Sequence, residues 1–554
     1  MKSVASMVAL LLAATAAPAA THTVELQQLG TYASGAFAVG GAEIVTYDPI
    51  TRRAFVVNAA ETTIDVLDIR NPSSPVKVGN IDASALGGSA NSVDVKLGIV
   101  AVAIEADLKT DPGIVAFYRS HDLKFLGQVA VGALPDMVTF TPDGRYVLVA
   151  NEGEPDDNYL VDPDGSVSII DLRRGVSRAT VKHATFTAFN SQIDSLRAQG
   201  VRIYGPQPDL TVAQNLEPEY ITVEGNRAYV TLQEANAIAT IDIAQAKVLK
   251  IQPLGFKDHM LPENTLDASD RDGITVFDGV SFRGKINPKN WPVFGMYQPD
   301  SIGSYIVKGV TYLVTANEGD TRSVAGYDEE VRMGSAEIDS TFPNLAALRD
   351  LASLGRLTLT KATGDTDGDG DLDQLFVPGG RSFSIWNAAT GAQVFDSGSD
   401  FESIIGNLRP QGFNANHELN NDATSANSKS FDTRSDNKGP EPEGLAIGTY
   451  FGRTYAFIGM ERASGIMVYD ITVPAAPEII QYLDNRNLAV PACTGALNPA
   501  TGLCTDSNPA AGDLGPEGLH FVPWYLSPTF RPLLIVGNEV SGSTTVYQLN
   551  LKAQ

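Results

Sequence analysis

The sequence predicts an all-β protein, a seven-bladed β-propeller closed by pairing of an N-terminal strand with the last blade. A strand–turn–strand motif with a carboxylate at each end returns seven times along the chain. Short strand candidates come in groups of four, in units of roughly 40 to 50 residues, as in propeller blades. The seventh unit supplies only three strands, and residues 24–30 form a strand that can complete it and remove an open sheet edge. A pair of β-sandwiches, the alternative, leaves the sevenfold period unexplained.

The clearest copy of the motif runs from Pro135-Asp136 through a turn at residues 142–144 to Asn151-Glu152. Because an antiparallel hairpin returns to the edge it left, Asp136 and Glu152 should lie at one end, on strands about 4.8 Å apart. The first strand of a blade lines the central channel, so the carboxylates of all copies should converge on one channel mouth. The other copies pair Glu43 with Glu61, Asp94 with Glu105, Glu219 with Glu234, Asp300 with Glu318, Glu443 with Glu461, and Glu517 with Glu539.

Crowded carboxylates repel one another and raise one another's pKa values, so this arrangement needs cations or hydrogen-bond donors. Hard metal ions such as Ca²⁺ or Mg²⁺, which take several oxygen ligands, suit it. The alternative is that each carboxylate accepts backbone N–H bonds from the adjacent blade. The candidate metal ligands are Glu43, Asp136, Glu152, Glu219, Glu234, Asp300, Glu318, Glu443, Glu461, Glu517 and Glu539.

A second candidate metal site lies in an insertion at residues 319–380, which separates two strands of the fifth unit. Its acidic run spaces carboxylates on alternate residues around a glycine, as a calcium loop requires. The twelfth position is Phe376, so the run is no true EF-hand, and a solvated acidic loop is the alternative. The carboxylates of this run are Asp365, Asp367, Asp369, Asp371 and Asp373.

Five cationic or titratable residues near the motif copies are candidate catalytic residues for an anionic substrate: His417, His520, Arg322, Arg462 and Lys438. Arginine suits phosphate oxygens and histidine can serve as an acid. Each is alternatively a surface ion pair. The chain has no Gly-x-Ser-x-Gly element, His-Glu-x-x-His motif or phosphate-cradling glycine loop.

Composition and terminal signals indicate an exported protein. Residues 1–20 read as a signal peptide, with a plain N-terminal helix as the alternative, and no later stretch reaches membrane-spanning length. Cys493 and Cys504 flank one loop, so we expect a local disulfide after export. A net charge of −25 argues against nucleic acid as a partner. We expect residues 21–554 to form one monomeric propeller in the periplasm or the medium.

Four motifs resemble those of the choice-of-anchor I family: residues 150–154 (Ala-Asn-Glu-Gly-Glu), 316–322 (Ala-Asn-Glu-Gly-Asp-Thr-Arg), 379–386 (Gly-Gly-Arg-Ser-Phe-Ser-Ile-Trp) and 438–444 (Lys-Gly-Pro-Glu-Pro-Glu-Gly). These are exported propellers related to phytase-like and esterase-like propellers, and their C-terminal anchors vary; we expect none after residue 540. Some members resemble an atypical alkaline phosphatase.

The resemblance implies a metal-dependent phosphomonoesterase-like hydrolase acting on small phosphate esters. Its cofactors would be Ca²⁺ and a second divalent or iron ion. In this hypothesis Arg322 and Arg462 hold the phosphate oxygens, and His417 or His520 protonates the leaving alcohol. The alternative is a calcium-stabilised binding or adhesion propeller without catalysis.

Overall fold

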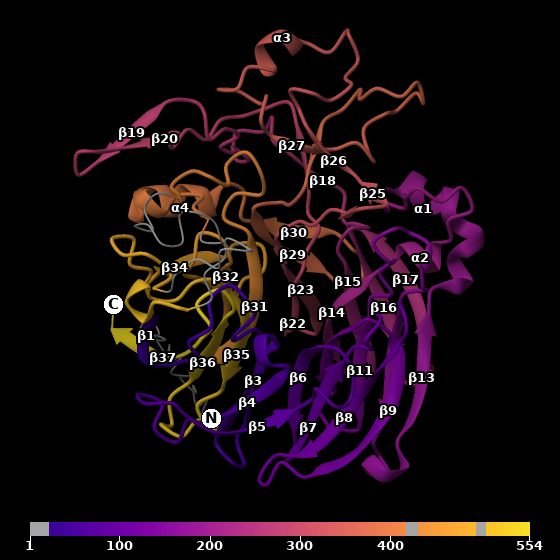
Figure 1. Ribbon diagram of the computed structural model, residues 1–554, viewed down its shortest axis with the longest axis vertical. Helices are drawn as coiled ribbons and strands as arrows, with labels where there is room; N and C mark the ends of the chain where they lie inside the picture. Colours follow the sequence, from indigo (N-terminus) through magenta and orange to yellow (C-terminus); the bar gives the residue numbers. More distant parts are fainter. Residues whose placement is uncertain (1–21, 417–429, 495–505, 554) are drawn as a thin grey trace, which may run out of the picture.

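The computed structural model describes residues 22–416, 430–494 and 506–553, and these residues form an all-β, propeller-like fold (Figure 1). They contain seven four-stranded antiparallel sheets. The first three sheets are formed by β2 (Val45–Asp48), β3 (Arg53–Asn58), β4 (Thr63–Asp68) and β5 (Val76–Asp82); by β6 (Ala90–Lys96), β7 (Ile99–Ile104), β8 (Pro112–Arg119) and β9 (Phe125–Ala133); and by β10 (Pro135–Phe140), β11 (Tyr146–Asn151), β12 (Ser166–Asp171) and β13 (Thr180–Thr185).

The other four sheets follow in chain order. They are formed by β14 (Pro218–Glu224), β15 (Arg227–Leu232), β16 (Ala237–Asp242) and β17 (Lys247–Pro253); by β22 (Ile302–Val307), β23 (Val310–Asn317), β29 (Ser382–Asn387) and β30 (Gln393–Asp396); by β31 (Pro442–Tyr450), β32 (Arg453–Met460), β33 (Ile466–Asp470) and β34 (Glu478–Leu483); and by β35 (Pro516–Val522), β36 (Leu533–Asn538), β37 (Ser543–Ala553) and β1 (His22–Ala33).

The innermost strands bring the sheets together. Each of β2, β6, β10, β14, β22 and β31 contacts the first strand of the next sheet, and β35 contacts β2. The two chain ends share a sheet, because β1 pairs with β37 in a register that runs from His22 opposite Ala553 to Ala33 opposite Ser543. Residues from both ends of the chain therefore belong to the sheet that lies between the sixth and the first.

Burial follows the position of a strand within its sheet. Second strands such as β7 are buried along nearly their whole length, because neighbouring sheets cover both faces. Outer strands such as β5 alternate between exposed and partly buried residues, because one face meets solvent. The core lies between sheets; the cluster between the third and fourth contains Leu148, Val167, Ile169, Val230 and Ile241.

The insertion between β23 and β29 packs on the long loop before β22. Parallel pairing of β28 (Phe376–Val377) with β21 (Phe294–Met296), which also pairs with β18 (Phe256–Asp258), joins the two segments in one sheet. Their shared core includes Leu266, Val293, Met333, Leu357 and Leu375. The loop and the insertion thus form one packed unit at the top of Figure 1.

The remaining elements are short. A hairpin of β19 (Ile274–Phe277) and β20 (Val280–Arg283) projects from the long loop (Figure 1). The amphipathic stretch expected at residues 345–354 forms only one helical turn, α3 (Leu345–Leu348). The others are β24 (Ser323–Val324), β25 (Tyr327–Asp328), β26 (Glu330–Arg332), β27 (Thr358–Thr360), α1 (Ile193–Gln199), α2 (Val212–Asn215), α4 (Asp400–Leu408), η1 (Ala59–Glu61), η2 (Val176–Arg178), η3 (Thr187–Gln192), η4 (Pro410–Gly412) and η6 (Pro509–Ala511).

Three of the sequence predictions fall outside the described residues. They concern the signal peptide at residues 1–20, His417, and Cys504 of the expected disulfide with Cys493. None of the helices in the described part of the chain is long and apolar enough to cross a bilayer.

Candidate functional site

The opening carboxylates of the motif lie at irregularities in the strand pairing. In four sheets a proline pairs with the second strand and the register then shifts before pairing resumes: Pro135 opposite Asn151, Pro218 opposite Leu232, Pro442 opposite Met460 and Pro516 opposite Asn538. The carboxylate residue directly follows each proline and so occupies the bulge. Bulges re-aim side chains and recur beside functional sites, which accounts for the turn of these carboxylates toward the centre.

The backbone is strained before two of these prolines, Pro135 and Pro442, and before Pro299, which precedes the opening carboxylate of the fifth sheet. Leu134, Gln298 and Glu441 have φ values of 45°, 43° and 53°, in the left-handed region that residues other than glycine rarely adopt. Such strain persists only where the surrounding structure imposes it, and it concentrates at functional sites. The same conformation therefore sets the direction of Asp136, Asp300 and Glu443.

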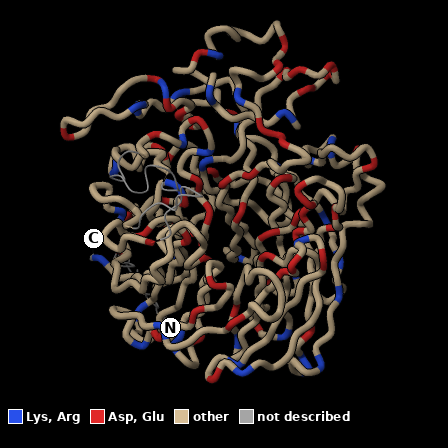
Figure 2. Tube along the Cα trace, viewed as in Figure 1, with Lys and Arg blue, Asp and Glu red and all other residues tan. Residues whose placement is uncertain are grey.

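These side chains gather around one cavity of about 190 Å³. Asp136, Glu152, Glu219, Asp300 and Glu517 line it, together with Asn91, Gln233 and Tyr220. Figure 2 shows acidic positions on the strands around the centre of the molecule. We call this site the acidic mouth and define it by Glu43, Asp136, Glu152, Glu219, Asp300, Glu318, Glu443, Glu461, Glu517 and Glu539.

Crowding in a low-dielectric site raises the pKa values of these groups. Burial, with the charges of Glu539 and Asp136, raises the pKa of Glu43 to about 8. Burial and the charge of Asp300 raise the pKa of Asp136 to about 7. The pKa values of Glu443 and Glu517 are also raised well above the ordinary value, by burial first and neighbouring carboxylates second. The mouth holds more negative charge than it can accommodate without protons or cations.

Several mouth carboxylates lack partners. Glu443 and Glu517 each have one buried oxygen without a hydrogen-bond partner. Within the described residues, Lys or Arg forms an ion pair with only two mouth carboxylates, Glu318 and Glu461. The alternative of full satisfaction by neighbouring backbone N–H groups therefore does not describe this site.

Two groups of carboxylates at the mouth have metal-ligand spacing, and the second includes Glu441, which is not one of the mouth residues defined above. One oxygen from each of Glu43, Glu517 and Glu539 lies within 4.8 Å of the other two. The second group, Glu318, Glu441 and Glu461, already contains cations. Lys438 bridges Glu318 and Glu441, Arg434 donates to Glu441 through Nε at 2.7 Å, and Arg462 lies 2.8 Å from Glu461. The first group is the better candidate for a metal ion.

The first two copies of the motif differ from the prediction. Because β2 pairs Val45 with Val56, Ala59 takes the position that Glu152 holds in the third sheet. Glu61 lies at the rim, where its carboxylate is 3.6 Å from the Lys77 ammonium. In the second sheet Ala90 pairs with Ile104, so Asn91 takes the opening position. Asp94 lies farther along the strand and accepts hydrogen bonds from Thr46 and the Phe140 N–H. Glu61 and Asp94 therefore do not belong to the mouth.

Glu234 lies one residue beyond the closing position of the motif in the fourth sheet. Leu232 pairs with Pro218, so the closing position belongs to Gln233, whose amide donates to Glu318 at 2.9 Å. Glu234 is 5 % exposed, and its Oε2 has no hydrogen-bond partner. Burial and the charge of Glu217 raise its pKa well above the ordinary value. It extends the acidic group toward the insertion.

Arg322 does not serve the mouth as a phosphate clamp. Its guanidinium is 7 % exposed and pairs with Glu217 at 2.8 Å. It also donates to the carbonyls of Tyr204 and Asn215 at 3.2 and 2.9 Å, and it lies over the Tyr204 ring. With all three of its guanidinium nitrogens engaged by the protein, Arg322 ties the insertion to the segment before β14.

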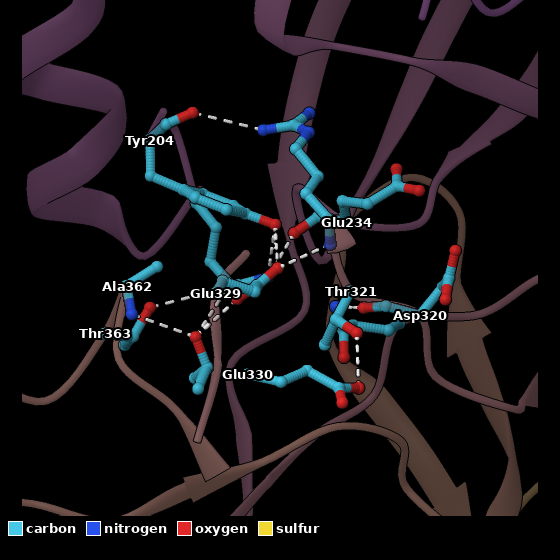
Figure 3. Close-up of polar contacts among 12 residues, drawn as sticks. Tyr204, Glu234, Asp320, Thr321, Glu329, Glu330, Ala362 and Thr363 are labelled. Carbon is cyan, nitrogen blue, oxygen red and sulfur yellow. Dashed lines mark hydrogen bonds and ion pairs between the residues drawn. The ribbon is translucent and has the colours of Figure 1, made fainter. Parts of the chain in front are cut away.

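A neighbouring buried network reinforces this junction (Figure 3). Glu329 is fully buried and accepts hydrogen bonds from Arg202, the Tyr204 hydroxyl and Thr360. Figure 3 shows Tyr204 and Glu329 facing one another, with Glu234 close by. Asp320, at the start of the insertion, is by contrast exposed. The network holds the insertion against the mouth without contributing a free cation.

His520 lies on a different cavity. It lines a space of about 670 Å³ with Lys96, Asp94 and Phe140, farther along the same first strands. Burial and the charge of Lys96 lower its pKa to about 4. His520 thus lies on a cavity next to the mouth and not among the mouth carboxylates, and its role as the proton donor stays a prediction.

The acidic run in the insertion forms a turn of its own. Asp365 accepts hydrogen bonds from the N–H groups of Gly368 and Gly370, at 2.7 and 3.1 Å, and Asp373 accepts from Thr366. One oxygen each of Asp365, Asp367 and Asp373 lies within 4.8 Å of the others. Asp369 and Asp371 lie outside this group. The loop is exposed, and it remains a predicted metal site.

Sequence reasoning missed two residues that organise the mouth. Glu441 accepts from Arg434 and pairs with Lys438, and Glu217 pairs with Arg322. Both precede the proline before an opening carboxylate, in the sequence Glu-Pro-Glu. That repeated tripeptide is the signal that could have identified them.

The comparisons place the chain in a family. The model of the choice-of-anchor I domain matches residues 43–474, so the protein belongs to that family. Gigasin-3a of Magallana gigas is 29 % identical over 198 residues, which are 36 % of this chain and 65 % of the relative. A mesenchyme-specific cell surface glycoprotein of Strongylocentrotus purpuratus is 28 % identical over 328 residues, 52 % of this chain and 40 % of the relative. The chain thus matches less than two thirds of each relative's length.

Solved structures with similar folds are distant in sequence. The β-propeller domain of Myceliophteria thermophila Cps50 (Swd1) is 8 % identical with a TM-score of 0.41, covering 94 % of this chain and 99 % of that one. Hydrazine synthase of Kuenenia stuttgartiensis is 12 % identical with a TM-score of 0.42, covering 92 % and 96 %.

Proposed function

We propose that this protein is an exported, metal-dependent phosphoesterase, a seven-bladed propeller with its active site at the acidic mouth. The seven sheets, the contacts among their first strands and the β1–β37 pairing support a ring of seven blades. One observation carries the function: carboxylates from several sheets converge on one cavity, and most of them have no ion pair with Lys or Arg in the part of the chain that the structure describes.

The residues of the mouth fit hard divalent ions. Glu43, Glu517 and Glu539 would hold one, because their oxygens are close together and one oxygen of Glu517 has no other partner. A bound divalent ion lowers the pKa of a coordinated water and neutralises phosphate charge. We propose Ca²⁺ here, with a second divalent or iron ion among the remaining mouth carboxylates.

Two cationic side chains of the chain itself would position the substrate. Arg462 is partly exposed between Glu441 and Glu461, where its guanidinium faces the mouth. Lys438 is held between Glu318 and Glu441. These groups would orient phosphate oxygens at the edge of the cavity, while the buried surroundings exclude bulk water and strengthen the electrostatic contacts.

The test uses purified full-length protein, a chromogenic phosphate monoester, and added Ca²⁺, Mn²⁺ or Fe. Turnover that chelator abolishes and metal restores is the expected result, and Glu517→Gln should reduce it at least tenfold. Glu61→Gln is the matched control, because that glutamate lies at the rim of the same ring of sheets. Absence of turnover with every metal would exclude the proposal.

A calcium-stabilised binding or adhesion propeller is the second candidate. The name of the cell surface glycoprotein relative favours it, as does the position of His520 away from the mouth. In this case Ca²⁺ would raise the melting temperature as much as it would in a phosphoesterase, but no ester would be hydrolysed.

A further inference from the structure

A large cavity lies next to the acidic mouth, between the innermost strands of the sheets. Its volume is about 670 Å³, and each of the seven first strands contributes residues to its wall. It shares four lining residues with the mouth cavity: Ile44, Ser92, Met137 and Tyr220. The two cavities therefore adjoin, and this one, which we call the channel cavity, continues along the first strands away from the mouth.

The wall of the channel cavity is mostly apolar. It includes Val95 of β6, Ile221 of β14, Ile302 of β22, Leu445 of β31 and Leu519 of β35. Cavities of this size that combine apolar walls with a few polar groups are typical of small-molecule sites. The channel cavity therefore offers a surface for the apolar part of a ligand.

The channel cavity reaches solvent at the end away from the mouth. Ile50 and Leu97 follow the ends of β2 and β6, and Tyr525 and Leu526 follow the end of β35. All four residues line the cavity, and all four are exposed. Exposed apolar residues that lie together often mark a binding site. An apolar chain can therefore enter from this end without passing the mouth carboxylates.

The channel cavity contains a basic side chain that the protein does not pair. Lys96, the last residue of β6, is the only Lys or Arg among the described residues of the wall. In the part of the chain that the structure describes, its ammonium forms no ion pair or hydrogen bond. Asp94 accepts hydrogen bonds from the Thr46 hydroxyl at 3.0 Å and the Phe140 N–H at 2.8 Å, and Asp48 accepts from the turn that follows it. The acidic side chains of the wall thus have other donors, and the Lys96 charge is available to a ligand.

His520 lies on the same wall and within reach of the Lys96 charge. Burial, followed by that charge, lowers the pKa of His520 to about 4, so the imidazole is neutral at pH 7. Within the described residues its ring forms no hydrogen bond. A neutral imidazole has one N–H to donate. Lys96 and His520 together can therefore offer a positive charge and a hydrogen-bond donor to one anionic group.

We propose that the channel cavity binds an amphipathic anion, an alkyl chain that ends in a carboxylate. The carboxylate accepts charge-assisted hydrogen bonds from Lys96 and a hydrogen bond from His520, and the chain lies along the apolar wall. The mouth carboxylates at the inner end repel an anion, so the charged group stays at the Lys96 end. This binding site does not depend on the proposed hydrolase activity.

The test is isothermal titration calorimetry of the full-length protein with decanoate and with decanol, in calcium-free buffer. The two probes share the chain and differ in the charge. The wild type should bind one decanoate per chain, and Lys96→Met should weaken this binding at least tenfold while decanol binding changes less than twofold. Lys308→Met is the matched control, because Lys308 is exposed in the turn between β22 and β23 and does not line the cavity. It should leave the binding of both probes unchanged.

A second variant tests the apolar part of the site. Thr139 lines the cavity from β10 and is partly buried, and in the described part of the chain its hydroxyl forms no hydrogen bond. Thr139→Trp should fill part of the cavity and weaken both probes at least tenfold, with the melting temperature measured to confirm that the variant folds. Absence of decanoate binding by the wild type would overturn the proposal. Equal weakening of decanoate and decanol by Lys96→Met, or full affinity for both probes in folded Thr139→Trp, would overturn it as well.

Discussion

Burial of the mouth carboxylates, together with their mutual repulsion, makes the stability of the metal-free protein depend on pH. Consider Asp136, whose pKa is about 7 in the folded protein. In the unfolded chain the same group has a pKa of about 3.9. Between these values the folded protein binds the additional proton, so rising pH favours unfolding. The stabilisation is fully present below pH 4 and is lost as the pH rises through 7.

The size of this change in the free energy of unfolding follows from the shift in the pKa of Asp136. Three pKa units correspond to about 4 kcal/mol for this one group, of which about 3 kcal/mol falls between pH 5 and pH 8. Glu43 and Asp300 are shifted in the same direction, with pKa values of about 8 and about 7. Because these groups repel one another, their shifts share a cause and do not add. The loss of stability calculated for Asp136 alone is therefore a lower bound on the loss for the whole mouth.

The assay is urea unfolding of chelator-treated protein at pH 5 and pH 8, repeated in CaCl₂. We expect the metal-free protein to lose about 3 kcal/mol or more between the two pH values. Calcium should stabilise the protein more at pH 8 than at pH 5, because it then competes with fewer protons. Glu43→Gln should flatten the pH dependence and the rim control Glu61→Gln should not. Equal stability of the metal-free protein at both pH values would refute the argument that the mouth is over-charged.

Three further predictions test single residues. Arg322→Met should destabilise the protein by about 3 to 5 kcal/mol in urea unfolding, because it leaves the buried Glu217 charge without a partner. Adding Glu217→Gln should recover part of this loss, because it removes that charge. Full additivity of the two free-energy changes would contradict the buried pair. Asp373→Asn should lower the calcium stoichiometry of the insertion loop without changing hydrolysis, and an unchanged stoichiometry would identify the loop as merely solvated. His520→Gln should leave hydrolysis and its pH profile between 5 and 8 within about twofold of wild type. Loss of the alkaline limb of the profile would instead identify the histidine as the proton donor.

The mouth carboxylates could be predicted from the sequence where a proline fixes the start of the first strand. Pro135 and Pro516 each pair with the asparagine that ends the second strand, so the next residue on both strands is a mouth carboxylate. Where proline is missing, spacing alone misled. In the first sheet Asn58 still ends the second strand, but Ala59 follows it, and Glu61 lies two residues too late. Strand register, not the distance between two acidic residues, decides membership of the mouth.

The partners of the basic side chains were harder to predict from the sequence. Arg322 lies four residues after the mouth residue Glu318, but the chain enters the insertion between them. The partner that engages the arginine, Glu217, is more than a hundred residues away in sequence. Local spacing contains no information about such a contact. The same holds for Lys438, whose bridge to Glu318 joins residues 120 positions apart.

The repeated Glu-Pro-Glu tripeptide shows how the protein distributes its charge. In both copies the glutamate before the proline takes the basic side chains: Glu217 pairs with Arg322, and Glu441 pairs with Lys438, Arg434 and Arg462. The glutamates after the proline, Glu219 and Glu443, turn toward the channel, where burial and like charges raise their pKa values.

Basic side chains thus neutralise the outer pair of carboxylates, Glu217 and Glu441, whereas the inner pair, Glu219 and Glu443, forms no ion pair with Lys or Arg among the described residues. A fold that needed only internal neutrality would pair the inner carboxylates as well. Glu219 and Glu443 therefore need protons or cations from solution, and this need is the premise of the metal binding that we propose.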